Sequence, residues 1–346
     1  MPFNKIMRYD KNTYLRAGGL NAAVNSIFKF SGVIYATGTF TDLEGIAYGA
    51  GGTTGGMAKW DEPTAAWIML ARFTGADSGG NVIASSGGIM YVGGGFTSVT
   101  PVGGGPIAIK LIATFTPPNT WAQTGNGLQA GGAYSMYDDA GTLWIGGSFT
   151  QDGLANPLNR IVTWNGVAFT AQGDAVGLST TVKAITKFNA LMTIGIQHDT
   201  QFTVLTEGYL RKLSGGLWIK LDGLTNNNVH VLLTRNPGTE ELHIGGEFTQ
   251  CKDLPRYRYT RYTVVSGYIA QSTLTGGNSG LNKGVRAIEE FSSDIYIGGD
   301  FTSDPDDSQR GPLRIAKIVG DKILSVPLIG RQRNPNQPVR ALRNIT

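Results

Sequence analysis

Cysteine, histidine and charged residues are all scarce in this chain of 346 residues. The single cysteine, Cys251, excludes an intrachain disulfide, so no disulfide framework holds the fold. Three histidines leave little material for a metal centre, and charged residues make up only 16% of the chain. No run of about 18 apolar residues predicts a membrane-spanning helix. The first ten residues hold no apolar segment of the kind that signal peptides contain.

Glycine is abundant instead, with 50 residues, and one short phrase recurs along the chain. Its copies carry the phenylalanines Phe40, Phe96, Phe149, Phe248 and Phe301, at intervals of 56, 53, 99 and 53 residues. The long interval holds a degenerate copy at Leu191–Gln197. A period of about 50 residues that carries strands is typical of β-propellers and related arrays.

Pairs of glycines precede the phenylalanine in four of these copies. They are Gly93 and Gly94, Gly146 and Gly147, Gly245 and Gly246, and Gly298 and Gly299. We expect a Cβ at these points to collide with a neighbouring backbone, and glycine to permit a positive φ where the strand ends. The phenylalanines, and the tryptophans of later strands, are expected to pack between neighbouring sheets.

Alternating apolar and polar residues predict four strands, a to d, in each repeat. Strand a is expected seven times, at Val24–Phe30, Val82–Ser86, Ala133–Asp138, Val182–Phe188, Val229–Thr234, Val285–Phe291 and Val339–Ile345. Strand c is also expected seven times, at Ile6–Asp10, Met57–Asp61, Ile107–Ala113, Arg160–Trp164, Gly208–Leu213, Tyr259–Val264 and Arg314–Val319. Strand b is expected only six times, because no copy precedes Ile6–Asp10.

These counts predict an all-β fold and a single β-propeller domain over residues 1–346. Six whole blades would be joined by a seventh, composite blade, built from strands c and d at Ile6–Asp10 and Thr13–Ala17 and strand a at Val339–Ile345. Such a closure removes open sheet edges. The composite blade then has three strands or takes its strand b from another chain. A six-bladed ring with spare terminal strands is the alternative.

The repeat resembles kelch repeats, and more closely the GGxFT-type propeller repeat of many bacterial and viral proteins. Leu143–Trp164 and Ile295–Val319 match that pattern best, and Met57–Asp61 carries a Trp-Asp pair at the end of strand c. Leu191–Gln197 departs most, since it lacks the glycine pair and the phenylalanine. The resemblance implies a kelch-like binding or scaffolding module, although a few kelch-type propellers are oxidases.

One segment carries arginines and a lysine interleaved with tyrosines. Its candidate binding residues are Lys252, Arg256, Tyr257, Arg258, Tyr259, Arg261 and Tyr262. Guanidinium groups and flat aromatic faces together suit nucleic acid, glycan or a protein hot spot. The same alternation is also what an exposed strand c would show, so both interpretations stay open.

Catalytic and metal sites are poorly represented. His243 occupies the position that Tyr35, Tyr91, Trp144 and Tyr296 take in other copies, which favours a packing role. No nucleophilic triad is recognisable, and we expect no cofactor. Alternating carboxylates can hold Ca²⁺, and Asp304, Asp306 and Asp307 form one such run, but a polar turn explains it as well.

The favoured hypothesis is therefore a non-enzymatic structural or binding propeller, located in a virion or the cytoplasm. Its partners would be proteins of a larger assembly, such as a phage tail, or a glycan or other surface receptor, because recognition concentrates in loops on rigid scaffolds. A glycan-active or metal-dependent propeller enzyme is the first alternative. A propeller that binds nucleic acid through the Arg/Tyr segment is the second.

Overall fold

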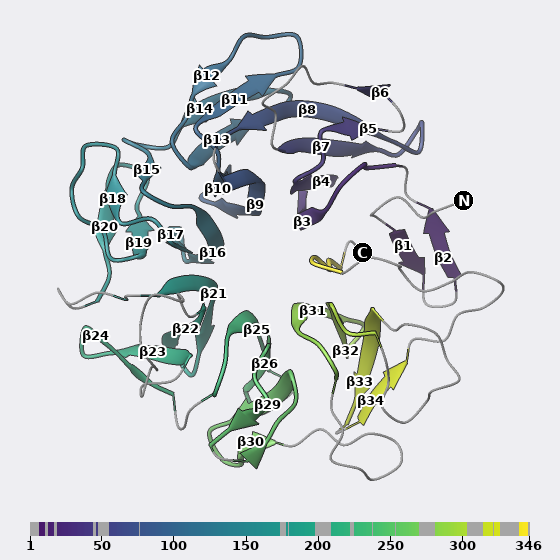
Figure 1. Cartoon of the computed structure of the whole chain (residues 1–346), viewed down its shortest axis with the longest axis vertical. Coiled ribbons are helices and arrows are strands. Elements are labelled where there is room, and N and C mark those ends of the chain that lie inside the picture. The colour runs from purple at the N-terminus through teal and green to yellow at the C-terminus, as the bar shows by residue number, and fades with distance from the viewer. Residues whose placement is uncertain are drawn as a thin grey trace. The chain divides into compact units, whose positions relative to one another are not determined.

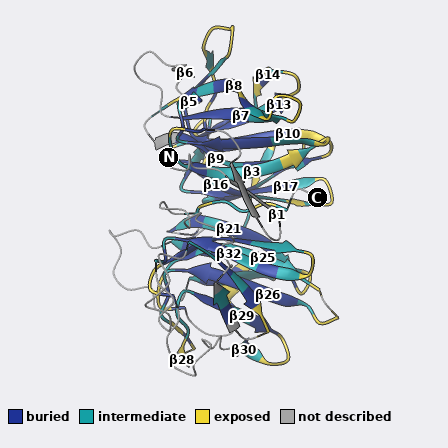
Figure 2. Ribbon diagram, turned by 90° about the vertical axis from the view of Figure 1, so that its right-hand side faces the viewer, coloured by how far each residue is buried: buried dark blue, intermediate teal, exposed yellow. Residues whose placement is uncertain are grey.

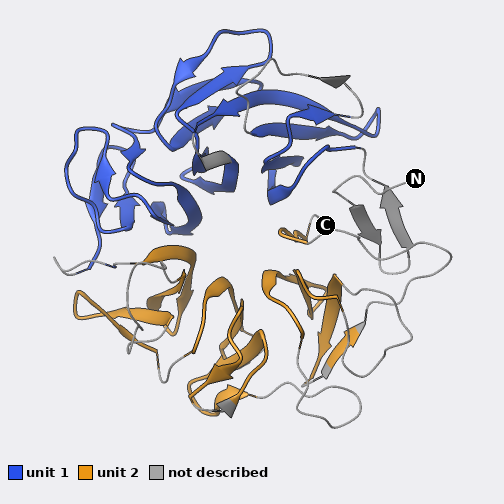
Figure 3. Ribbon diagram, in the orientation of Figure 1, with its two compact units in different colours: residues 1–178, 345 blue, residues 179–344, 346 orange. Residues whose placement is uncertain are grey.

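The chain folds into β-strands that belong to two compact units, Met1–Leu178 and Ser179–Asn344 (Figure 3). In this computed structural model the described residues contain strands but no helix. The described residues are 7–10, 13–16, 19–43, 46–47, 55–75, 77–173, 178, 180–197, 209–221, 225–236, 238–252, 254–269, 281–302, 314–320, 322–325 and 339–344. Over these ranges the protein is all-β, as the sequence predicts.

Six antiparallel sheets share one plan, in which four strands, a to d, follow one another in chain order (Figure 1). Unit 1 holds sheet 1 (β3 Val24–Phe30, β4 Val33–Gly38, β7 Gly55–Asp61, β8 Ala66–Thr74), sheet 2 (β9 Asp77–Ser86, β10 Ile89–Gly95, β13 Ile112–Thr116, β14 Thr120–Gln123) and sheet 3 (β16 Ala133–Asp139, β17 Thr142–Gly147, β19 Ile161–Trp164, β20 Phe169–Ala171). Unit 2 holds sheet 4 (β21 Thr181–Phe188, β22 Leu191–Gln197, β23 Leu210–Ser214, β24 Leu217–Lys220), sheet 5 (β25 Val229–Arg235, β26 Glu241–Gly246, β29 Tyr259–Thr263, β30 Gly267–Ile269) and sheet 6 (β31 Val285–Phe291, β32 Asp294–Gly299, β33 Ile315–Val319, β34 Lys322–Ser325).

Four pairs of shorter strands occur in addition to the six sheets. They are β1 (Met7–Asp10) with β2 (Thr13–Arg16), β5 (Asp42–Leu43) with β6 (Ile46–Ala47), β15 (Leu128–Gln129) with β18 (Gln151–Asp152), and β27 (Gln250–Cys251) with β28 (Leu254–Pro255). Two further strands, β11 (Ser98–Pro101) and β12 (Ile107–Ala108), extend sheet 1 beyond β8. The sequence predicted one strand over Ile107–Ala113, but it is broken, because Leu111 adopts a left-handed φ of 64° just before β13 begins.

Strand b lies in the most buried part of each sheet. All residues of β26 are buried, and all of β10 except its first (Figure 2). The degenerate copy also forms a strand b, β22, with five consecutive buried residues. The six expected copies of strand b are therefore confirmed, including the one that lacks the glycine pair and the phenylalanine.

The two glycines of each pair are required for different reasons. The first glycine position faces the next segment along the array. A Cβ added there would lie 2.5–2.6 Å from the Cγ1 atom of a valine in that segment. The contacts are Gly195 with Val229, Gly245 with Val285, and Gly298 with Val339. A Cβ on the second glycine would overlap a carbonyl oxygen at the start of strand a in its own sheet, as Gly246 would with Asn228. The pair therefore sets how closely neighbouring sheets approach.

The expectation of a positive φ at these glycines is wrong. Gly93, Gly94, Gly245, Gly246 and Gly298 all keep an ordinary strand backbone with no positive φ. Positive φ occurs instead at the a–b hairpin turns, for example at Gly32 and Gly141. Space, and not backbone conformation, is therefore what the paired glycines supply.

The segment 339–344 takes the position of a strand a beside sheet 6. Val339 packs against Gly298 as Val285 packs against Gly245 in the sheet before it, and its amide donates to the Gly299 carbonyl at 3.2 Å. The side-chain amide of Asn344 donates to the Glu290 carbonyl of β31 at 3.3 Å. The sequence predicted a strand over Val339–Ile345, but the described residues 339–344 form no strand and pack beside sheet 6 without strand pairing.

Aromatic residues fill the space between sheets within each unit. The five recurring phenylalanines, at positions 40, 96, 149, 248 and 301, are completely buried, and Trp67, Trp121, Trp164 and Trp218 are nearly so. Trp164 of sheet 3 donates its indole N–H to the Tyr91 hydroxyl of sheet 2 at 3.2 Å. Burial of these large apolar groups is the main source of stability of the array.

In three copies the threonine after the phenylalanine belongs to a second repeated arrangement of hydrogen bonds. The side-chain oxygen of Asn226 accepts from the amides of Thr249 and Gln250 at 2.8 and 3.0 Å, and its NH₂ group donates to the Thr249 hydroxyl. Asn21 makes the same contacts with Thr41, and Asn282 with Thr302. This arrangement ties the loop after strand b to the segment that leads into strand a.

We expect substitutions at Thr37 of sheet 1 and Gly80 of sheet 2 to have coupled effects on the free energy of unfolding, because the two residues face each other. Thr37 stands at the first glycine position of β4, and it faces Gly80, which stands where other sheets have valine or alanine. Gly80→Val alone should lower the free energy of unfolding by about 1–3 kcal/mol, because the new side chain overlaps Thr37. Adding Thr37→Gly should restore part of this loss, as measured by urea unfolding. Additive losses in the double variant would contradict the packing described here.

Candidate functional site: the Arg/Tyr segment and the polar cluster

The Arg/Tyr segment, Lys252–Tyr262, runs from the end of β27 through β28 into β29, the strand c of sheet 5. Lys252 is exposed, whereas Arg256 and Tyr257 are half-buried. The guanidinium of Arg256 donates to the carbonyls of Pro255 and Tyr268, at 2.7 and 3.3 Å. Lys252, Arg256 and Tyr257 are thus the members of the predicted binding set that lie before the strand and keep access to solvent.

Arg258 has a structural role that recurs in other sheets. Its guanidinium donates to the Glu247 carbonyl, and its own carbonyl accepts from the Gly246 amide at 2.9 Å. Arg160 and Arg314 make the equivalent pair of contacts, with Ser148 and Gly147 and with Asp300 and Gly299. The recurrence of arginine immediately before three copies of strand c is a sequence signal for this role, and the sequence interpretation missed it.

The remaining tyrosines of β29 face the core. Tyr259 is 1% exposed and Tyr262 is 6% exposed. The Tyr262 ring packs against Phe188 of sheet 4 and Tyr268 of β30, with ring centroids 5.7 and 4.9 Å apart. Neither tyrosine offers a flat face to a ligand, so the alternation of arginine and tyrosine over this strand reflects its two sides.

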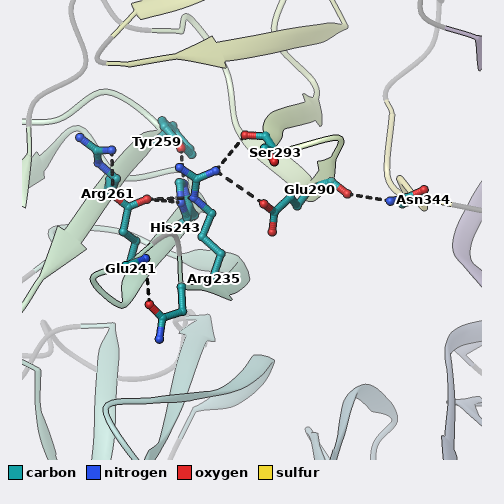
Figure 4. Close-up of polar contacts among 10 residues, drawn as sticks. Arg235, Glu241, His243, Tyr259, Arg261, Glu290, Ser293 and Asn344 are labelled. Carbon is teal, nitrogen blue, oxygen red and sulfur yellow. Dashed lines mark hydrogen bonds and ion pairs between the residues drawn. The ribbon is translucent and has the colours of Figure 1, made fainter. Parts of the chain in front are cut away.

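A buried polar cluster surrounds His243, where four other copies of strand b carry a tyrosine or tryptophan (Figure 4). His243 Nδ1 lies 2.6 Å from the Tyr259 hydroxyl, and Nε2 lies 3.4 Å from Glu241 Oε2. Glu241 also pairs with Arg235 and Arg261, each at 2.9 Å. Arg261, one of the three arginines of the predicted binding set, therefore neutralises the Glu241 carboxylate inside sheet 5.

The cluster continues into sheet 6. Arg235 Nη1 donates to the Ser293 carbonyl at 3.1 Å and lies 3.7 Å from Glu290 Oε1. Figure 4 shows Arg235 between Glu241 on one side and Glu290 on the other, with Asn344 beyond Glu290. The polar cluster thus connects sheets 5 and 6 with the segment 339–344, through residues that no local sequence pattern associates.

Burial governs the protonation of this cluster. Removal from water, with the nearby charge of Arg235 as a second cause, lowers the pKa of His243 from 6.5 to about 4. Burial also raises the pKa of the Tyr259 hydroxyl, so that hydroxyl stays protonated and donates to a neutral His243. The pKa of Glu241 is lowered even though burial, the largest effect, acts to raise it, because Arg235 and Arg261 stabilise the carboxylate.

This arrangement combines a hydroxyl, an imidazole and a carboxylate, but it is packed shut. His243 and Tyr259 are each 1% exposed, so a substrate has no route to their polar atoms. The thiol of Cys251 is completely buried, and its burial raises its pKa to about 12, which leaves it unreactive. These groups lie enclosed within sheet 5 and its flanking loop.

The metal candidate lies elsewhere. Asp304, Asp306 and Asp307 lie outside the described residues, as does His198. Among the described residues, no group of three or more histidine, cysteine, aspartate or glutamate side chains is arranged to hold a metal ion. Within the part of the chain that the structure describes, no helix is long and apolar enough to cross a bilayer.

Comparison with known proteins gives structural neighbours only. No family model matches the chain, and no curated protein matches it. The computationally designed Ika8 protein is similar over 94% of this chain and 92% of its own, with 12% sequence identity and a TM-score of 0.49. The WD40 β-propeller domain of Doa1 is similar over 93% of this chain and 86% of its own, with 12% identity and a TM-score of 0.48.

A third neighbour is a Bacteroides uniformis protein provisionally assigned as a 6-phosphogluconolactonase. It is similar over 90% of this chain and 94% of its own, with 9% identity and a TM-score of 0.48. Identities of 9–12% transfer the activity of none of these proteins to this chain.

We expect Arg258→Ala to act on stability and not only on binding. Loss of the guanidinium leaves the Glu247 carbonyl without its donor and should lower the free energy of unfolding by about 1–3 kcal/mol. Arg314→Ala, which removes the equivalent contact in sheet 6, should have a similar effect. The matched control Lys252→Ala, at an exposed side chain, should stay within about 0.5 kcal/mol. Equal stability of all three variants in urea unfolding would contradict this role.

The polar cluster predicts a specific pH dependence of stability. The unfolded chain takes up a proton on His243 near pH 6.5, whereas the folded chain does so only near pH 4. Lowering the pH between these values therefore favours unfolding, by up to about 1.4 kcal/mol per pH unit from this residue. His243→Tyr, which inserts the residue of other copies, should flatten the plot of unfolding free energy against pH over that range. An unchanged slope would show that the pKa of His243 is the same in the folded and the unfolded protein.

Proposed function

We propose that this chain is a seven-bladed β-propeller that serves as a non-enzymatic structural or binding component of a larger assembly. Its six four-stranded sheets are the blade unit of such a fold. The seventh blade is composite, with segment 339–344 as its strand a and β1 and β2 as its strands c and d. Closure of this kind leaves no open sheet edge at either end of the array.

The packing of Val339 is the observation that supports seven blades. It meets Gly298 in the way that Val229 meets Gly195 and Val285 meets Gly245, which is the contact of a strand a with the preceding sheet. A contact of this kind beside sheet 6 supports a further blade after it. In a six-bladed ring the place beside Gly298 would belong to the strand a of sheet 1 and not to a seventh copy of strand a.

The burial of the chemically reactive side chains supports the proposal that the protein is not an enzyme. His243, Tyr259 and Cys251 are the groups of the Arg/Tyr region best suited to chemistry, and each is enclosed in sheet 5 or its flanking loop. Lys252, Arg256 and Tyr257 stay accessible at the loop after strand b, where they suit recognition of a protein or a glycan. The kelch-like character of the repeat agrees with a virion or tail protein that binds partners through such loops.

Cryo-electron microscopy of particles purified with the protein tests both parts of the proposal. We expect the chain to be found in the particle as a ring of seven blades, with β1 and β2 in the same blade as segment 339–344. A ring of six blades would overturn the count. Recovery of the chain only as a free protein, absent from every particle fraction, would overturn the structural role.

The enzymatic alternative has a separate measurement. A panel of glycans and chromogenic substrates, combined with metal analysis of the purified protein, should give no turnover above a heat-inactivated control. Turnover with a stoichiometric metal would overturn the non-enzymatic proposal, whatever the number of blades.

A further inference from the structure

Each strand a carries one extra residue opposite the glycine pair. In sheet 6 the register between β31 and β32 shifts between Val285 and Ala287, which leaves Arg286 as the bulged residue. His230 of sheet 5 and Lys183 of sheet 4 are bulged residues in the same position of their strands. A bulge of this kind turns a side chain out of the regular alternation of a strand and is frequent beside binding sites.

The bulged residues differ in kind between the two units. Unit 1 has Asn25, Asn81 and Tyr134 at these positions. The two asparagines donate to carbonyls of the following sheet, Asn25 to Gly80 and Asn81 to Ala133, both at 3.1 Å. A neutral side chain is therefore enough to connect one sheet with the next.

Unit 2 has a basic side chain at every corresponding position. Lys183, His230 and Arg286 are followed by Arg340, which stands after Val339 as Arg286 stands after Val285. We call these four residues the basic row. Because the asparagines of unit 1 meet the packing requirement without charge, the charges of the basic row call for another explanation.

The middle of the basic row is held rigidly. Arg286 donates to Asp300, to Glu247 and to Nε2 of His230, each at 2.7 Å. Burial lowers the pKa of His230, which fits a neutral ring that accepts this bond. Arg286 and Glu247 nevertheless keep about a third of their side-chain surface in solvent, at 32% and 33%.

The ends of the basic row carry charge toward solvent. Lys183 is half-buried and lies close enough for its charge to act on His230, and Arg340 is exposed. Two further guanidinium groups, those of Arg258 and Arg314, stand behind Glu247 and Asp300 and donate to their carbonyls. Arg286, between Glu247 and Asp300, therefore has Lys183 on one side of it in the row and Arg340 on the other, and all three keep access to solvent.

We propose that the basic row of unit 2 is a binding site for a ligand that carries several phosphate or carboxylate groups. The fold supplies one basic side chain for each sheet, so a ligand with repeated anionic groups matches the row better than a single ion does. Arg286 provides a preorganised centre, and Lys183 and Arg340 provide charge-assisted contacts on either side. This inference concerns unit 2 alone and holds whether or not the ring closes with seven blades.

Calorimetric titration with tripolyphosphate and, separately, with citrate tests the proposal on the full chain at pH 7 and low salt. We expect binding of at least one probe, and the tighter of the two identifies the anionic group. The variant K183Q/R340Q should weaken that binding by about tenfold or more, through the loss of two partly exposed charge pairs. Both substitutions leave the contacts of Arg286 in place.

A matched control removes the same charge elsewhere. Lys29 and Lys220 are exposed and lie outside the basic row, so K29Q/K220Q should bind the probe within about twofold of the original protein. Circular dichroism and thermal unfolding confirm that both variants fold. The proposal is overturned if neither probe binds the original protein, if K183Q/R340Q binds as well as the original, or if the control loses as much affinity.

Discussion

The close approach of neighbouring sheets at the glycine pair is the constraint on which the rest of this structure depends. A Cβ at Gly245 or Gly298 would occupy the space of the next valine, and a Cβ at the second glycine would occupy that of a carbonyl. With those atoms absent, the aromatic side chains close over the junction and bury completely. Sheet 1 reaches the same spacing with the sizes exchanged, since Thr37 faces Gly80. Total volume at the contact, and not glycine as such, is what the array preserves.

Polar residues in this protein mostly hold the frame in place. Arg160, Arg258 and Arg314 each join the loop after strand b to the start of strand c, and asparagines such as Asn226 fix the same loop from its other side. A rigid loop of this kind presents its remaining side chains, among them Lys252 and Tyr257, with little loss of entropy on binding. The structural and recognition interpretations of the Arg/Tyr segment therefore apply to different residues within it.

The two units use one plan for different purposes at the bulge of strand a. In unit 1 the bulged asparagines donate hydrogen bonds to carbonyls of the next sheet. In unit 2 the bulged residues are basic, and Arg286 keeps about a third of its side-chain surface in solvent. The bulge itself is repeated in every sheet, whereas the kind of side chain at the bulge differs between the units. The buried cluster around His243 is a departure of another kind, since a histidine that contacts Tyr259 stands where other copies have a tyrosine or tryptophan.

Most strand positions, the six copies of strand b and the burial of the recurring phenylalanines could be predicted from the amino-acid sequence alone. These features depend on residue size and alternation within one repeat, which a local pattern records directly. The folded structure was needed to show that Arg258 supports a loop, that Arg261 neutralises Glu241, and that Arg286 contacts His230 of the neighbouring sheet. The partner of a long polar side chain is set by which strands lie side by side, and here those strands are separated by dozens of residues along the chain. A pattern within one strand cannot distinguish an arginine that meets a carbonyl from one that meets a ligand.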